Sequence, residues 1–137
     1  MSIKRRISDD DGRAALESWS RARSAGANGA DGADGAEGAA ALPRSTRATA
    51  VRYTLEELAT RAPGNSVEVR VPPFGVCQCV EGPRHTRGTP PNVIEMDPAT
   101  WLELATGLTD WEAAVGTGKV LASGSRADLS EWMPLRR

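Results

Sequence analysis

The residues best suited to chemistry gather in one stretch of the chain, from Cys77 to Arg87. Cys77 and Cys79 stand two apart, and the single histidine, His85, follows in a loop rich in glycine and proline. Zinc needs three or four ligands, and a C-x-C pair with one histidine supplies three at an unusual spacing. A Cys/His nucleophilic pair is compatible with the sequence, but cysteines buried in a strand are usually inert. We therefore expect no metal, no cofactor, no catalytic residue and no enzyme activity.

The loop that holds the histidine suits a different task. Arg84, His85 and Arg87 could bind a carboxylate or phosphate group, since guanidinium groups contact such anions bidentately. A long loop inside a compact domain is more often functional than a plain connection. The alternative is that these side chains are solvated or pair with Glu81 and Glu95. We treat the three as candidate contacts for an anionic head group.

Length and charge limit the classes of partner. The chain has 137 residues and a formal net charge of -1, so it has room for one domain and no strong attraction to nucleic acid or to an anionic membrane. No apolar run reaches the roughly 18 residues of a membrane span, and the N-terminus lacks the apolar core of a signal peptide. A disulfide between cysteines two apart in a strand would be strained, which favours free thiols. We expect a small soluble cytoplasmic protein without nucleic-acid partners or stable membrane insertion.

The first 43 residues are predicted to form a helix and a tether. Within residues 1–23, aspartates precede an apolar stripe that contains Leu16 and Trp19, which is typical of an amphipathic helix. The stripe is narrow, so this helix must dock on the main domain or fray. Residues 24–43 are mostly glycine and alanine and cannot offset the entropy of ordering. We expect them to be a disordered tether.

Residues 44–137 predict one α+β domain. Apolar residues at three-and-four spacing indicate a helix over 44–62. Strands over 67–71 and 76–80 should form an antiparallel hairpin, because a turn rich in proline separates them. The second strand carries apolar side chains on both faces, so we expect it to lie inside the sheet. Which of its faces meets the core stays open.

Further elements follow in the C-terminal half. In order they are a strand over 93–96, a helix from Asp97, a helix from Thr109, a strand over 119–123 and a last helical turn from Asp128. Asp97 and Pro98 have the residue types of an N-cap and a first helical position. Thr109 and Glu112 have the spacing of a capping box.

This order of elements resembles the sterol carrier protein 2-like superfamily. The residues that carry the resemblance are VIEM before Asp97 and Pro98, the helix with Trp101 and Leu104 that ends at Gly107, the helix from Trp111, GKVLASG at 118–124 and ADLS at 127–130. Within the superfamily, the run over 61–107 is similar to a bacterial orthologue group found in actinobacteria. The resemblance covers residues 44–135.

The resemblance implies a small, twisted, mainly antiparallel sheet covered by helices, with a tunnel between them that holds a lipid or another apolar small molecule. Candidate lining residues at apolar stripe positions are Met96, Trp101, Leu104, Trp111, Val115, Leu121, Leu129 and Trp132. Each could equally be ordinary core. An empty tunnel of about 300 Å³ would cost roughly 7 kcal/mol, so a ligand, water or bulky side chains should fill it.

Two other functions stay open. The chain could be an interaction module whose N-terminal helix or basic loop binds a protein partner. It is also similar to the accessory domain of mycothiol-dependent maleylpyruvate isomerase-like proteins, in which a metal-binding helical bundle supplies the catalytic half. No histidine precedes His85 here, so such a catalytic half is missing from this sequence.

Overall fold

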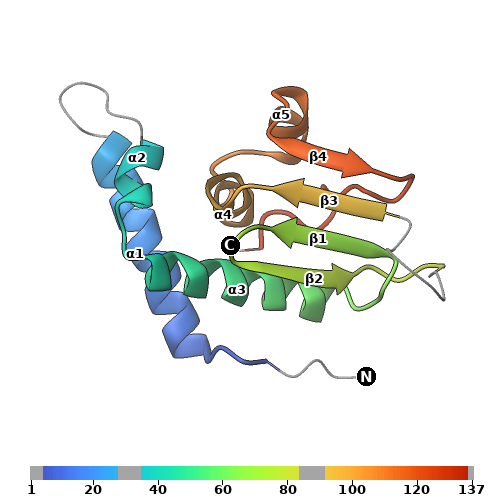
Figure 1. The fold of residues 1–137 in the computed structure, drawn as a ribbon, viewed down its shortest axis with the longest axis horizontal. Coiled ribbons are helices and arrows are strands. Elements are labelled where there is room, and N and C mark those ends of the chain that lie inside the picture. Colours follow the sequence, from blue (N-terminus) through green and yellow to red (C-terminus); the bar gives the residue numbers. More distant parts are fainter. Residues whose placement is uncertain (1–4, 28–34, 84–91, 136–137) are drawn as a thin grey trace.

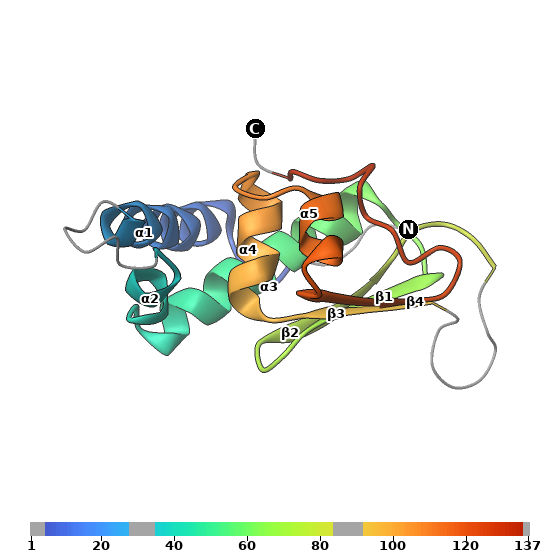
Figure 2. The same cartoon turned by 90° about the horizontal axis from the view of Figure 1, so that it is seen from above.

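A four-stranded sheet with helices on one face forms the centre of the protein (Figures 1 and 2). The computed structural model describes residues 5–27, 35–83 and 92–135. The strands are β1 (Val67–Val71), β2 (Gly75–Cys79), β3 (Asn92–Met96) and β4 (Val120–Ser123), in the spatial order β2-β1-β3-β4. β1 pairs antiparallel with β2 and parallel with β3, and β3 pairs antiparallel with β4. The predicted α+β class is confirmed, with a sheet that is mixed rather than purely antiparallel.

Alternation along the strands decides which face of the sheet meets the core. In β1, Val67, Val69 and Val71 are fully buried, while Glu68 and Arg70 between them are partly exposed. β3 has the same alternation. The valine face is covered by helices, whereas the opposite face is left open by the helices that the structure describes (Figure 2).

Three helices cover the buried face: α3 (Arg44–Arg61), α4 (Pro98–Thr106) and α5 (Trp111–Gly116). α4 begins as predicted, because the Asp97 carboxylate accepts a 2.7 Å hydrogen bond from the Thr100 amide and Pro98 takes a first-turn position. The predicted cap of α5 was wrong. Asp110, not Thr109, is the N-cap, and its carboxylate accepts a 2.7 Å bond from the amide of Ala113.

The last predicted helical turn is a hydrogen-bonded turn in the structure. The Trp132 amide donates to the Leu129 carbonyl oxygen over 2.9 Å, and the Asp128 carboxylate accepts from the Ser130 amide over 2.8 Å. Leu129 is fully buried there. The turn therefore anchors the C-terminal segment without forming a helix.

The N-terminal region is more ordered than the sequence predicted. α1 spans Asp9–Ala27 and packs against α3, and α2 (Gly35–Ala40) packs against α1 (Figure 1). The approach of α1 to α3 is close at Gly12, where an added Cβ would lie 2.1 Å from the Tyr53 ring. The tether prediction is therefore wrong for residues 24–27 and 35–40, which are helical, while residues 28–34 lie outside the described residues.

β2 also differs from its prediction, because it is an edge strand. Its two faces are both partly apolar, but only one is buried: Cys79 is inaccessible, whereas Val76 on the opposite face is 58% exposed. The cysteine face meets the core, since Cys79 and Cys77 stand opposite Val67 and Val69 of β1. Apolar side chains on both faces did not indicate a central strand here.

Candidate functional site: a groove between α3 and β2

A groove of about 1220 Å³ runs between α3 and the free edge of β2. Its lining contains both apolar and charged side chains. Arg52, Leu55 and Ala59 of α3 form one wall. The other wall contains Phe74, which precedes β2, and Val76 and Cys77 of β2. The helix α3 and the strand β2, which are separated in the sequence, thus form one concave surface.

Helical spacing explains the α3 side of the groove. Arg52, Leu55 and Ala59 are three and four residues apart, so they lie on one face of the helix. Gly75 allows the strand to approach this face, because an added Cβ at Gly75 would lie 3.0 Å from the Leu55 Cδ1 atom. A larger residue there would require the Leu55 side chain to shift.

The N-terminal segment contributes to the groove as well. The backbone amides of Arg6 and Ile7 donate to the Glu56 carboxylate over 3.1 and 3.2 Å. Both residues line the groove. Residues before α1 are therefore part of this surface, held by a side chain of α3.

Cys77 lines the groove with a thiol that is difficult to ionise. The hydrogen bond between the Cys77 and Cys79 side chains raises the pKa of Cys77 far above its usual range, and burial raises it further. Both cysteines are free. Among the described residues no group of three His, Cys, Asp or Glu side chains could hold a metal ion. His85 lies outside the described residues, so the absence of a metal or catalytic site stays a prediction.

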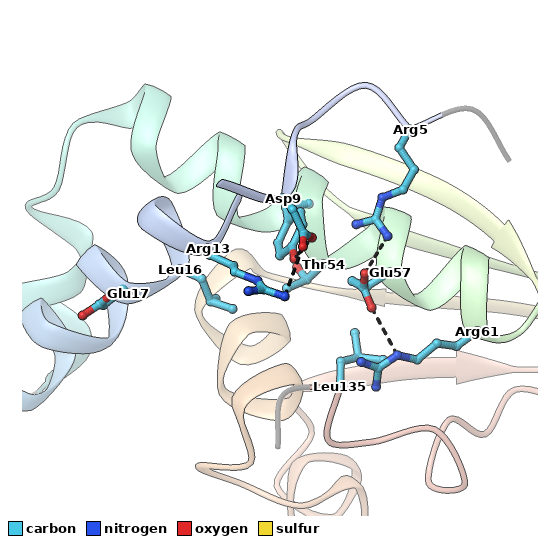
Figure 3. A pocket seen from close by; sticks show the side chains of 10 residues that line it. Arg5, Asp9, Arg13, Leu16, Glu17, Thr54, Glu57, Arg61 and Leu135 are labelled. Atoms are coloured by element: carbon cyan, nitrogen blue, oxygen red, sulfur yellow. Dashed lines mark hydrogen bonds and ion pairs between the residues drawn. The ribbon is translucent and has the colours of Figure 1, made fainter. Parts of the chain in front are cut away.

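A second pocket, of about 590 Å³, lies where the N-terminal segment meets α3 (Figure 3). Several of its charged groups pair with one another, although the Nη2 atom of Arg5 is buried without a hydrogen-bond partner among the described residues. Glu57 accepts hydrogen bonds from Arg5 and, over 3.2 Å, from the Nε atom of Arg61. The Tyr53 hydroxyl donates to the Asp9 carboxylate over 2.6 Å. These pairs connect the N-terminal segment to α3, and we assign the pocket a structural role.

The Tyr53 contact also changes the titration of both groups. The hydrogen bond from the Tyr53 hydroxyl lowers the pKa of the Asp9 carboxyl. Burial, and then the same bond, raises the pKa of Tyr53. The contact is therefore strongest when Asp9 is ionised and Tyr53 is protonated.

None of the predicted site residues that the structure describes lines the groove. Arg84, His85 and Arg87 are outside the described residues. The predicted lining residues comprise the buried Met96, Trp101, Leu104, Trp111 and Leu129, the partly buried Trp132, and the exposed Val115 and Leu121. None of them lines the groove or the second pocket.

Two of the predicted lining residues are exposed, whereas residues inside a tunnel between sheet and helices would be buried. Val115 is 40% exposed and Leu121 is 67% exposed. Leu121 stands opposite Glu95 of β3, on the open face of the sheet, because side chains alternate along β4. For all eight residues, contact with a ligand stays a prediction.

The sequence did not predict the groove, because its apolar residues follow the same spacing as residues that pack in the core. Leu55 belongs to the apolar stripe of α3, and such a stripe indicates packing against the core. The informative signal was Gly75, a glycine immediately before a strand, which indicates close approach of another element.

Comparison with known proteins decides the family. Residues 43–135 match the model of the bacterial SCP ortholog family. The chain belongs to this family. The match to the SCP ortholog family includes both walls of the groove, α3 and β2, whereas α1 and α2 precede it. It confirms the resemblance found in the sequence and supports a lipid-binding type of domain. No curated protein matches the chain.

One further finding bears on membranes. In the part of the chain that the structure describes, no helix has the length and hydropathy needed to cross a bilayer.

Proposed function

We propose that the protein binds a lipid or another apolar small molecule in the groove between α3 and β2, without catalysing a reaction. The observation that carries the proposal is the row of apolar groups from Leu55, Ala59 and Phe74 in a concave surface. Its volume of about 1220 Å³ exceeds that of most small-molecule pockets, which hold roughly 300 to 1,000 Å³. An acyl chain could lie along it with one side still open to water.

Membership of the bacterial SCP ortholog family supports the same proposal. The resemblance implies a tunnel between sheet and helices, and the groove is likewise formed by a helix, α3, and a strand of the sheet, β2. Each methylene group that leaves water stabilises the complex by about 0.8 kcal/mol, so a chain of moderate length needs only partial burial. The free thiols of Cys77 and Cys79 favour a reducing compartment, and we propose the cytoplasm as the location.

One observation favours a protein-interaction module as a second candidate. β2 is an edge strand, so its outer backbone groups have no strand partner among the described residues. An extended peptide could add to this edge by β-augmentation. Such a peptide would depend on backbone hydrogen bonds, whereas an apolar small molecule would depend on the side chains in the groove.

Native mass spectrometry of the full chain with a lipid panel tests the proposal. Ala59→Phe should fill the groove and weaken lipid binding. Val76→Gln should weaken binding less, because the Val76 side chain lies on the open face of the sheet and Val76 only borders the groove at the edge of β2. Leu121→Gln is the matched control, because Leu121 is a similarly exposed apolar strand residue, at 67% against 58%, on the opposite edge. Equal binding by all variants, or no binding by the unmodified chain, would contradict the proposal.

A further inference from the structure

Three arginines of α3 converge on one aromatic residue. The guanidinium carbons of Arg44 and Arg47 lie 5.1 and 5.6 Å from the centre of the Phe74 ring. The Nε atom of Arg52 donates a 2.8 Å hydrogen bond to the Phe74 carbonyl oxygen. Positions 44, 47 and 52 lie on one side of the helix, so the turn before β2 brings three positive charges together.

These charges have no ion-pair partner in the part of the chain that the structure describes. Within residues 5–27, 35–83 and 92–135, none of the three arginines forms an ion pair, although six other arginines do. The Nε atom of Arg47 is buried without a hydrogen-bond partner. Asp97 lines a small pocket with Arg47, but its carboxylate caps α4. Glu56 is occupied by the backbone amides of the N-terminal segment.

The beginning of α3 adds to the positive potential. Its N-cap residue, Pro43, makes no side-chain hydrogen bond to the first amides of the helix, and the first turn contains no acidic residue. The positive end of the helix dipole therefore faces Arg44 and Arg47, an arrangement of like charges that is unfavourable without an anion. Free amides at a helix start and nearby guanidinium groups are both donors that bind phosphate or carboxylate.

We propose that Arg44, Arg47 and Arg52 form a site for an oxyanion, a phosphate or a carboxylate, at the Phe74 end of the groove. Arg52 and Phe74 line the groove as well, so an apolar chain lying in it would place a charged head group among the arginines. The inference rests on the proposed function, because it assigns the charged end of the same ligand. The bound molecule is then an anionic amphiphile.

The experiment compares ligands with the same chain and different heads. Hexadecanoate, hexadecyl phosphate and hexadecanol, each below its micellar concentration, are titrated against the full chain with displacement of a neutral fluorescent probe. The site predicts that the two anions bind at least about tenfold more tightly than the alcohol, with an advantage that shrinks as salt is added. Equal affinity for acid and alcohol would overturn the inference.

Variants assign the effect to the arginines. The triple variant Arg44→Gln, Arg47→Gln, Arg52→Gln should lose the preference for the anions and keep hexadecanol binding, while the triple lysine variant should retain part of it. If the triple glutamine variant does not fold, Arg44→Gln alone should reduce the preference, since Arg44 is exposed. Arg21→Gln, an exposed arginine of α1, is the control. An unchanged preference in the glutamine variants would overturn the inference.

Two further arms separate the sources of the anion. Inorganic phosphate that binds the unmodified chain as tightly as hexadecyl phosphate, and not the glutamine variant, would assign the site to a free oxyanion. Phosphatidylcholine vesicles with and without phosphatidylglycerol test a membrane surface, and binding to the anionic vesicles that neither hexadecyl phosphate nor hexadecanoate displaces would overturn an amphiphile site. If no amphiphile binds, the proposed function fails, and the phosphate arm alone then decides whether the arginines hold an oxyanion.

Discussion

The indole nitrogen of Trp101 donates a 2.7 Å hydrogen bond to the hydroxyl oxygen of Thr54, joining α4 to α3 inside the core. Trp101 is fully buried and Thr54 is 2% exposed. The Thr54 hydroxyl lies 2.8 Å from the Ala50 carbonyl oxygen, to which it donates. This chain of hydrogen bonds allows a tryptophan to fill the space beneath the sheet without leaving its N–H group unpaired.

Thr54→Val should lower the free energy of unfolding by about 1 to 3 kcal/mol, because it leaves the Trp101 N–H group buried without an acceptor. Urea unfolding measures the change. Thr60→Val is the control, since Thr60 is exposed and its hydroxyl bonds only to the Glu56 carbonyl oxygen, and it should change stability by less than about 0.5 kcal/mol. Equal losses in the two variants would argue against a role for the buried hydrogen bond.

Trp19→Ala should cost about 3 to 5 kcal/mol of unfolding free energy, because Trp19 of α1 is 1% exposed in the core that α1 shares with α3. Arg23 holds the far end of α1 through a 2.9 Å ion pair to Glu103 of α4. The same substitution at the partly buried Trp132 should cost less. If Trp19→Ala left the main unfolding transition unchanged, α1 would be a detachable helix.

The contact between Asp9 and Tyr53 predicts a pH dependence. Because the folded pKa of Asp9 is lowered, its stabilising effect is full above the unfolded pKa of about 3.9 and is lost as the pH falls through the folded value. Urea midpoints of the unmodified chain and Tyr53→Phe should therefore differ most near neutral pH and converge in acid. A difference that does not change between pH 7 and pH 2 would contradict the contact.

Tyr53 can also be followed directly, since it is the only tyrosine in the chain. Its pKa is raised, chiefly by burial, so the stability it contributes is full below the unfolded pKa of about 10 and is lost as the pH rises through the folded value. Tyrosinate absorbance in the folded protein should appear at higher pH than in urea. Coincident titration curves would show that Tyr53 is exposed.

Cys77 should react slowly with iodoacetamide. Its hydrogen bond to Cys79 and its burial raise its pKa, so the thiolate fraction at pH 8 is small, and alkylation of the folded chain should be at least about tenfold slower than in urea. Because Cys77 lines the groove, a bound apolar ligand should slow it further. Rapid alkylation in the folded state would contradict the protonated thiol.

The sequence predicted those helices and strands whose signals lie within their own segments, such as alternating apolar residues or an N-cap. The alternation of Val67, Glu68 and Val69 identified β1, and Asp97 with Pro98 identified the start of α4. α2 was missed because its Gly/Ala sequence carries no local signal, and Ala39 is buried only through contacts with distant residues. The edge position of β2 was missed for a related reason, since strand order is a property of the whole sheet.

The groove could not be predicted because it is formed by two elements that meet in space. Leu55 and Cys77 are ordinary apolar residues in their own segments, and they become a binding surface only when β2 lies against α3. The arginine cluster does have a signal in the sequence. Arg44 and Arg47 stand in the first turn of a helix without an acidic residue, which is an unusual start for a helix.

Photocrosslinking tests the binding groove most directly. A fatty acid that carries a diazirine in its chain is incubated with the full protein and irradiated, and the labelled residues are mapped by mass spectrometry. We predict labels on α3 near Leu55 and Ala59 and on β2 near Val76, abolished by excess hexadecanoate. Labels confined to α4 and α5, around Trp101 and Trp111, would contradict the groove and place the ligand between those helices and the sheet.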